Sequence, residues 1–125
     1  MAERCRIVVC DDHQSYRELV SLVLGLEPDL EVVGEAADGR QAIDVTRRLE
    51  PDAVLLDVSM PEMDGIEALP HIRAAAPGAK VIMVTAFGSE SVRRRATDAG
   101  AHAFVEKGGD IEDLVAEVRI VCGER

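Results

Sequence analysis

Acidic residues directly follow two strongly apolar segments of this 125-residue sequence. Asp57 comes after Ala53–Leu56, whereas Asp11 and Asp12 come after Ile7–Cys10. Short unbroken apolar runs are typical of strands buried on both faces of a parallel sheet, and open α/β sheets bind ligands where such strands end. If these strands are neighbours, three carboxylates share one crevice. A cation, a proton or a lysine must then offset their repulsion.

Two further functional groups are expected at the same edge of the sheet. Thr85 ends the apolar run Val81–Val84, and Lys107 follows Phe104-Val105 after one glutamate. The ends of four predicted strands therefore present three acids, one hydroxyl and one ammonium. Taken singly, each group has a plainer interpretation as a strand-end hydroxyl, a solvated lysine or a helix cap; Asp11 and Asp64 are the candidate caps.

Five apolar segments alternate with five segments of helical periodicity. The predicted strands are Cys5–Cys10, Leu30–Ala36, Ala53–Leu56, Ala79–Thr85 and His102–Val105. Apolar residues three or four positions apart predict helices around 16–24, 42–49, 66–72, 92–99 and 111–121. Proline or glycine closes each of the first four helices.

This alternation predicts a doubly wound α/β fold, (βα)₅, with helices on both faces of a parallel sheet. Right-handed crossovers leave few topologies, and the flavodoxin-like strand order 2-1-3-4-5 places the first and third strands side by side. Asp11, Asp12 and Asp57 then meet. Pro70 conflicts with the third helix, so we expect a kink there or a late helix start. One domain is expected over residues 1–125.

Composition and charge exclude several classes of function. Fourteen basic and 24 acidic residues give a net charge of −10, which disfavours direct binding of DNA or RNA. The run Arg93–Arg95 is interpreted as a solvated helix face, with partner docking as the alternative. No signal segment and no apolar stretch of roughly 18 residues occurs, so we expect a cytoplasmic protein without a membrane span.

Three cysteines are present, and we expect all of them to be reduced. Cys5 and Cys10 lie on opposite faces of one predicted strand and cannot bridge each other. Cys122 is distant in the sequence. Buried thiols of this kind are typical of a cytosolic protein.

In order and register, these residues resemble the receiver domain of two-component response regulators. The resemblance covers essentially the whole chain and rests on Asp11-Asp12, the segment Leu55–Gly65, Thr85-Ala86 and Lys107. Residues Glu31–Gly39 are similar to receivers that precede a helix-turn-helix output domain. No output domain is expected within these 125 residues.

The resemblance implies a phosphorylation site that uses Mg²⁺. Asp57 accepts a phosphoryl group from a sensor histidine kinase or a histidine phosphotransfer protein. Asp12 and Asp57 ligate Mg²⁺ directly, Asp11 acts largely through a coordinated water, and the backbone carbonyl of Ser59 completes the protein ligands. The protein is then no enzyme beyond its own phosphorylation and dephosphorylation.

The resemblance also implies a switch that reads the phosphate. Lys107 pairs with the phosphate, Thr85 donates its hydroxyl and moves, and Phe104 turns inward as Thr85 moves. The face built from the fourth helix, the strand His102–Val105 and the fifth helix changes shape, and it is a candidate homodimer surface in transcription regulation. Ile120 lies off the core stripe of the fifth helix and is a candidate contact.

Other functions fit the residues less well. A receiver fold that no longer accepts phosphate and acts as an interaction module is the main alternative. A flavin site is rejected because the acidic segment Cys10–His13 would repel a phosphate, where a flavin site needs a phosphate-binding loop. An aspartyl phosphatase is disfavoured because Ser59 occupies the position of the second acid that such an enzyme needs.

Two positions near the site carry separate expectations. Gly108 follows Lys107, so no cis peptide bond is expected between them. The bulk of Phe87 suggests that it shields the phosphoryl group from water.

Overall fold

The computed structural model describes residues 3–86 and 88–123 and contains five strands that alternate with five helices. The elements are β1 (Cys5–Cys10), α1 (Gln14–Gly25), β2 (Leu30–Ala36), α2 (Gly39–Leu49), β3 (Ala53–Asp57), α3 (Gly65–Ala75), β4 (Lys80–Thr85), α4 (Glu90–Asp98), β5 (Ala103–Glu106) and α5 (Ile111–Gly123). The predicted strand boundaries differ from these by at most one residue. The main difference is that Asp57 is the last residue of β3 itself.

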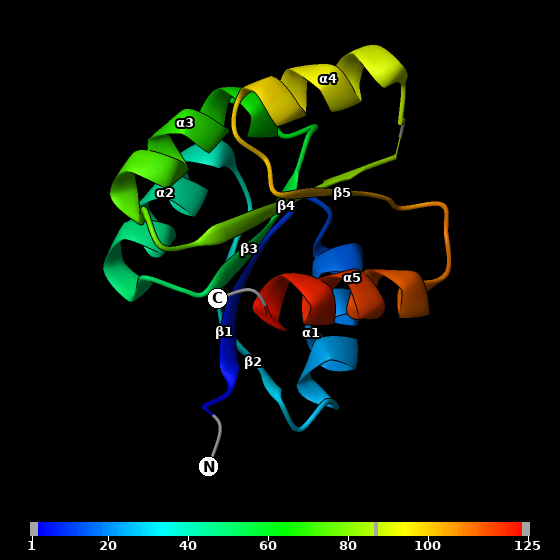
Figure 1. Cartoon of the computed structure of the whole chain (residues 1–125). Coiled ribbons are helices and arrows are strands. Elements are labelled where there is room, and N and C mark those ends of the chain that lie inside the picture. Colours follow the sequence, from blue (N-terminus) through cyan, green and yellow to red (C-terminus); the bar gives the residue numbers. More distant parts are fainter. Residues whose placement is uncertain (1–2, 87, 124–125) are drawn as a thin grey trace.

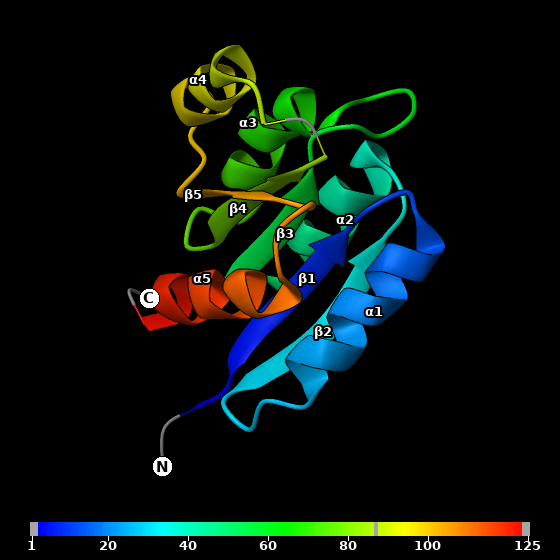
Figure 2. The same cartoon turned by 90° about the vertical axis from the view of Figure 1, so that its right-hand side faces the viewer.

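The sheet has the predicted strand order, β2-β1-β3-β4-β5, and the described strand pairs are all parallel. Helices α1 and α5 cover one face, and α2, α3 and α4 cover the other (Figures 1 and 2). Cys10, at the end of β1, pairs with Leu56 of β3. The carboxyl ends of these two strands are therefore adjacent, as the fold class requires.

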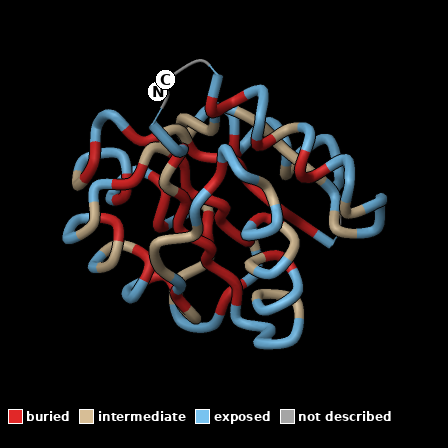
Figure 3. Tube along the Cα trace, turned by 90° about the horizontal axis from the view of Figure 1, so that it is seen from below, coloured by how far each residue is buried: buried red, intermediate tan, exposed pale blue. Residues whose placement is uncertain are grey.

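Alternate residues of each central strand enter two separate aliphatic cores. In β1, Ile7 and Val9 pack with α1 and α5, whereas Val8 and Cys10 pack with residues of α2, α3 and α4. Figure 3 shows the buried residues running through the centre of the molecule between exposed helix surfaces. Burying one Val, Leu or Ile side chain completely stabilises the folded state by about 1.5–3 kcal/mol relative to leaving it exposed. Within residues 3–86 and 88–123, no helix has the length and apolar content to cross a membrane.

The helix caps confirm one of the plainer interpretations and contradict another. Asp64 is the N-cap of α3; it accepts a hydrogen bond from Glu67 N at 2.8 Å, and the Glu67 carboxylate accepts one from Asp64 N. Asp11 does not cap α1, because the N-cap position is His13, whose side chain makes no capping bond. The prediction of a late start for α3 is wrong: the helix begins at Gly65 and continues through Pro70.

The expectation of three reduced thiols is wrong for two of them. A disulfide joins Cys5, the first residue of β1, to Cys122 in the last turn of α5, with a Cα–Cα distance of 5.9 Å. The sequence separation of 117 residues concealed this pair; packing of α5 against the sheet brings it together. Cys10 is free and buried, and burial and the charge of Asp11 raise the pKa of its thiol.

Gly65 allows α3 to start directly against the end of β3. Its amide donates to Val58 O at 2.8 Å, and a Cβ at this position would collide with the backbone carbonyl oxygen of Asp57. A backbone atom cannot move aside as a flexible side chain can. Glycine at residue 65 is therefore a requirement of the position of Asp57.

Replacing Gly65 with alanine is expected to lower the free energy of unfolding by about 1–3 kcal/mol, because the new methyl group overpacks against the Asp57 backbone. Urea denaturation measures this difference. Gly25→Ala is the matched control, since nothing lies within 4 Å of a Cβ there, and it should leave stability nearly unchanged. Equal stabilities of the two variants would contradict the collision.

Reduction of the Cys5–Cys122 disulfide is expected to lower the free energy of unfolding by about 2–4 kcal/mol, because the bond restricts the unfolded chain. Urea denaturation with and without dithiothreitol measures the loss. A Cys122→Ala variant should not respond to the reductant, whereas Cys10→Ala should respond as wild type does. Three free thiols in the untreated protein would contradict the disulfide.

Candidate functional site

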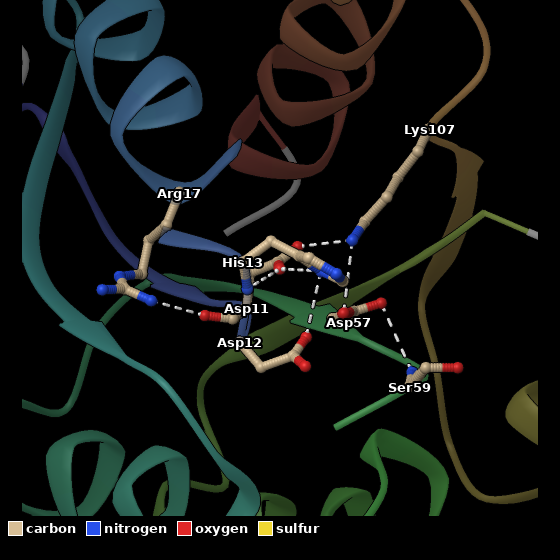
Figure 4. A network of polar contacts seen from close by, with 7 residues as sticks. All are labelled: Asp11, Asp12, His13, Arg17, Asp57, Ser59 and Lys107. Atoms are coloured by element: carbon tan, nitrogen blue, oxygen red, sulfur yellow. Dashed lines mark hydrogen bonds and ion pairs between the residues drawn. The ribbon is translucent and has the colours of Figure 1, made fainter. Parts of the chain in front are cut away.

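The carboxyl edge of the sheet gathers the residues that the sequence singled out. Asp11 and Asp12 follow β1, Asp57 ends β3, Thr85 ends β4, and Lys107 follows β5. Ligand atoms of Asp11, Asp12, Asp57 and His13 lie within 4.8 Å of one another. Figure 4 shows the side chains of Asp57, Asp12 and Lys107 converging from three strand ends.

Asp57 lies at the centre of the site and is only 2% exposed. Its Oδ1 accepts a long hydrogen bond of 3.3 Å from Ser59 N. Its Oδ2 lies 3.2 Å from Lys107 Nζ, which is close enough for an ion pair. Beyond this ion pair, no donor in the described part of the chain makes a well-formed hydrogen bond to Oδ2. A buried carboxylate oxygen therefore has room for another partner.

Asp11 is equally buried, but it is held from both sides. Its Oδ1 accepts from His13 N at 2.8 Å, and its Oδ2 lies 2.7 Å from Lys107 Nζ. Arg17 donates from Nη1 to Asp11 O at 2.7 Å and from Nε to Glu35 at 2.9 Å, which ties α1 to the end of β1. Asp11 is thus a fixed part of the site.

Asp12 is the exposed acid of the group. Its Oδ1 lies 3.2 Å from His13 Nδ1, and its side chain is 30% exposed. Ser59 is also exposed and follows Asp57 by two residues. Asp12 therefore offers an accessible carboxylate at the rim of the site, whereas the carboxylates of Asp11 and Asp57 are buried.

Burial, together with the charge of Asp11, raises the pKa of Asp57. Burial is the largest cause, the nearby charge of Asp11 adds to it, and together they raise the pKa to about 6 from 3.8. The Lys107 ammonium and the Ser59 N–H oppose this shift. The Lys107 ammonium therefore does not fully offset the effects of burial and of Asp11 on the pKa of Asp57.

Lys107 remains positively charged in this environment. Burial disfavours its charged form, but the hydrogen bond to Asp11 and the charges of Asp57 and Asp11 outweigh burial and raise its pKa. Its Nζ also lies 4.7 Å from the ring centroid of Tyr16. Burial raises the pKa of Tyr16 against the opposing charge of Lys107, so the phenol stays neutral.

Thr85 and Phe104 lie on the neighbouring strands β4 and β5. Thr85 is 4% exposed, and its backbone carbonyl accepts from Lys107 N at 2.8 Å. Phe104 is half-buried on β5 and packs against the core beneath α2, α3 and α4. The guanidinium carbon of Arg93 lies 4.9 Å from the centroid of the Phe104 ring. The backbone hydrogen bond joins the ends of β4 and β5 beside the site, and the ring contact joins β5 to α4.

Sequence reasoning missed the contacts of Tyr16 and Arg17, whereas His13 lies beside the acids at the start of α1, as its place in the sequence next to Asp12 predicts. Tyr16 had been assigned only to the apolar stripe of α1, although its aromatic ring in an aliphatic stripe was a usable signal. Ile120 is 57% exposed, as predicted. No cis peptide bond occurs in the described residues, in agreement with the expectation at Gly108. Phe87 lies outside the described residues, so its shielding role stays a prediction.

The donor atoms of the site fit a divalent cation that prefers oxygen. Asp11, Asp12 and Asp57 supply carboxylate oxygens, and Asp57 Oδ2 has capacity left for a ligand bond. An added cation would also offset the repulsion from Asp11, which adds to the effect of burial in raising the pKa of Asp57. The acidic cluster can therefore hold a metal ion.

Comparison with known proteins connects this geometry to one family. Residues 7–119 match the family model of the response regulator receiver domain. The response regulator VraR of Staphylococcus aureus is 38% identical over 114 residues, which is 91% of this chain and 54% of VraR. The chain spans about half the length of the curated relatives that it matches, including DegU of Brevibacillus brevis.

Solved structures agree with the sequence match. The signal receiver domain of NarL from Mycobacterium tuberculosis is 33% identical, has a TM-score of 0.93, and aligns over 99% of this chain and 100% of that one. CheY in a CheX–CheY–BeF₃–Mg²⁺ complex from Borrelia burgdorferi is 28% identical, has a TM-score of 0.88, and aligns over 95% of this chain and 90% of that one. The chain therefore belongs to the receiver domains of two-component response regulators.

Proposed function

We propose that this receiver accepts a phosphoryl group on Asp57 from a sensor histidine kinase or a histidine phosphotransfer protein. The observation that carries the proposal is the Asp57 carboxylate itself, which is buried, short of hydrogen bonds and placed between acids and Lys107. A carboxylate oxygen of Asp57 attacks phosphorus, the bond from phosphorus to the donor nitrogen breaks, and that nitrogen keeps the electron pair. An aspartyl phosphate results.

Mg²⁺ is the cofactor that this oxygen-rich site suits. Asp12 and Asp57 would hold it directly, Asp11 would act through a coordinated water, and the Ser59 carbonyl would complete the protein ligands. When bound, Mg²⁺ neutralises the carboxylates and the incoming phosphoryl oxygens together. The presence of BeF₃ and Mg²⁺ with the Borrelia CheY supports this assignment.

Lys107 and Thr85 would respond to the negative charge of the phosphoryl group on Asp57. A phosphoryl group adds about −1.5 to −2 charges at pH 7, and Lys107 is already within ion-pair distance of the acceptor. The ammonium can exchange its Asp11 contact for a phosphate oxygen, while the Thr85 hydroxyl donates to another. Each such bond is worth about 1.5–3 kcal/mol, so a few of them supply the roughly 5.5 kcal/mol that reverses a 99:1 population.

The output would be a change of the face formed by α4, β5 and α5. Movement of Thr85 frees space for Phe104, and Phe104 contacts Arg93 of α4. This face, with the exposed Ile120, is the candidate homodimer surface. Relatives such as DegU are transcriptional regulators, so control of transcription is the output that we propose for the signalling protein. Apart from its own phosphorylation and dephosphorylation, the receiver would catalyse nothing.

Acetyl phosphate with Mg²⁺ is expected to add one phosphoryl group to the wild-type protein, and Asp57→Asn should reduce the addition to background because the nucleophile is lost. Intact-protein mass spectrometry measures the gain. Excess EDTA should suppress it in the wild type as well.

Asp38→Asn is the matched control for this experiment. Asp38 caps α2 through Gln41 N at 2.9 Å, and asparagine caps helices equally well, so phosphorylation should persist. No mass gain in the wild type would overturn the proposal. The chain would then be a receiver that acts as an interaction module without phosphate.

The raised pKa of Asp57 predicts how stability depends on pH without metal. The folded protein keeps the Asp57 proton until about pH 6, whereas an ordinary aspartate releases it near 3.8. Ionisation of Asp57 therefore costs folding free energy as the pH rises through this window, and the cost is complete above it.

Asp57→Asn removes that cost and is expected to raise the free energy of unfolding by about 1–3 kcal/mol at pH 7.5 in EDTA. The advantage should shrink as the pH falls from about 6 toward 3.8, below which Asp57 is protonated in both states. Mg²⁺ should also reduce it. Urea denaturation at each pH measures the difference, and an advantage that persists unchanged at pH 4 would contradict the assigned cause.

A further inference from the structure

Tyr16 lies directly against the ammonium that the site uses. The Lys107 Nζ is 4.7 Å from the centroid of the Tyr16 ring and 2.7 Å from Asp11 Oδ2. The third contact of Nζ is Asp57 Oδ2 at 3.2 Å. The ammonium is therefore held by two carboxylates and one aromatic face, and its side chain is only 14% exposed.

The ring is held in place by the anchored first turn of α1. Arg17, the next residue, donates to Asp11 O at 2.7 Å and to Glu35 at 2.9 Å, and its own amide bonds to His13 O at 3.0 Å. Tyr16 itself packs against the core between the sheet and helices α1 and α5. The aromatic face thus has a fixed position relative to Asp11.

The Lys107 amide is bonded to Thr85 O at 2.8 Å, but the chain that follows it supplies less constraint. Lys107 follows the last residue of β5, and two glycines, Gly108 and Gly109, come next in the chain. Glycine permits many backbone conformations, so this loop does not fix the lysine side chain by itself. A small cleft of about 100 Å³ also borders the lysine and is lined by Tyr16, Leu19 and Ile111 among others. Water can approach from this side.

We propose that Tyr16 is a positioning residue that holds the Lys107 ammonium toward the phosphoryl site through its ring face. A cation over an aromatic ring is attracted by the ring electrons, and the attraction grows as water is excluded. An aliphatic residue at this place would still be apolar against the core that includes Leu114, but it would offer no such face. The proposal rests on the phosphorylation of Asp57 proposed above and assigns a further residue to that reaction.

Tyr16→Leu and Tyr16→Phe separate positioning from packing. Phenylalanine keeps the ring face, whereas leucine keeps only the apolar bulk. We expect Tyr16→Leu to slow phosphorylation by acetyl phosphate about 2- to 30-fold, the range that a cation–π contact is worth, and Tyr16→Phe to restore most of the rate. In a Lys107→Ala background, Tyr16→Leu should cause no further loss, because the ring acts through the lysine.

Nuclear magnetic resonance gives a second reading that does not depend on phosphorylation. The chain contains one tyrosine and only two lysines, Lys80 and Lys107, so the lysine side-chain signals are readily assigned. In the wild type and Tyr16→Phe, the ring current should shift the Lys107 CεH₂ protons upfield of those of Lys80. In Tyr16→Leu the Lys107 signals should move back toward the Lys80 position.

The outcomes distinguish this proposal from the proposed function. An unchanged Lys107 signal in Tyr16→Leu, or equal phosphorylation rates for wild type and Tyr16→Leu, would overturn the role of Tyr16 alone. Wild-type protein that accepts no phosphate would overturn the proposed function and the role of Tyr16 with it. Thermal denaturation of the two variants must show that both are folded at the assay temperature.

Discussion

The repulsion among buried carboxylates at one sheet edge is the constraint on which the rest of this structure depends. Asp11 and Asp57 are each 2% exposed, and a single ammonium, Lys107, lies between them. Burial and like charge raise the pKa of Asp57 to about 6, so the site is poised to accept a cation. A fold selected for stability alone would place apolar residues here. In the proposed function, this unfavourable arrangement is what creates a place for metal and phosphate.

The scaffold can sustain this cost because its two aliphatic cores hold each strand end in register. Alternate residues of β1, β3 and β4 enter opposite cores, so a one-residue slip would move each side chain into the other core and disrupt the packing of both. Gly65 lets α3 approach the Asp57 carbonyl, and the capping box at Asp64 fixes where that helix starts. At the opposite edge of the sheet, the disulfide joins the end of α5 to the start of β1.

Specific contacts hold β4, β5 and α4 together beside the site. The Lys107 amide bonds to the Thr85 carbonyl, which keeps the ends of β4 and β5 together. Phe104 lies on β5 between the core and Arg93 of α4. In the proposed mechanism, a charge placed on Asp57 would act first on Lys107 and Thr85, which lie at the ends of β5 and β4. Because Asp57 and Lys107 are largely excluded from water, their attraction at short range is stronger than that of a surface pair.

The sequence by itself determined the strands, their order, the acids at the sheet edge and the family. Apolar runs that end in Asp11, Asp57 and Thr85 report strand ends because burial on both faces leaves little choice of residue, and parallel topology then brings those ends together. Only the tertiary structure decided the Cys5–Cys122 disulfide, the role of Gly65 and the ring contact of Tyr16 with Lys107. The disulfide and the ring contact join residues that are far apart in the chain, and Gly65 meets the Asp57 carbonyl only because α3 folds back against the end of β3. Their juxtaposition follows from how helices pack on the sheet, and no local periodicity encodes that distance.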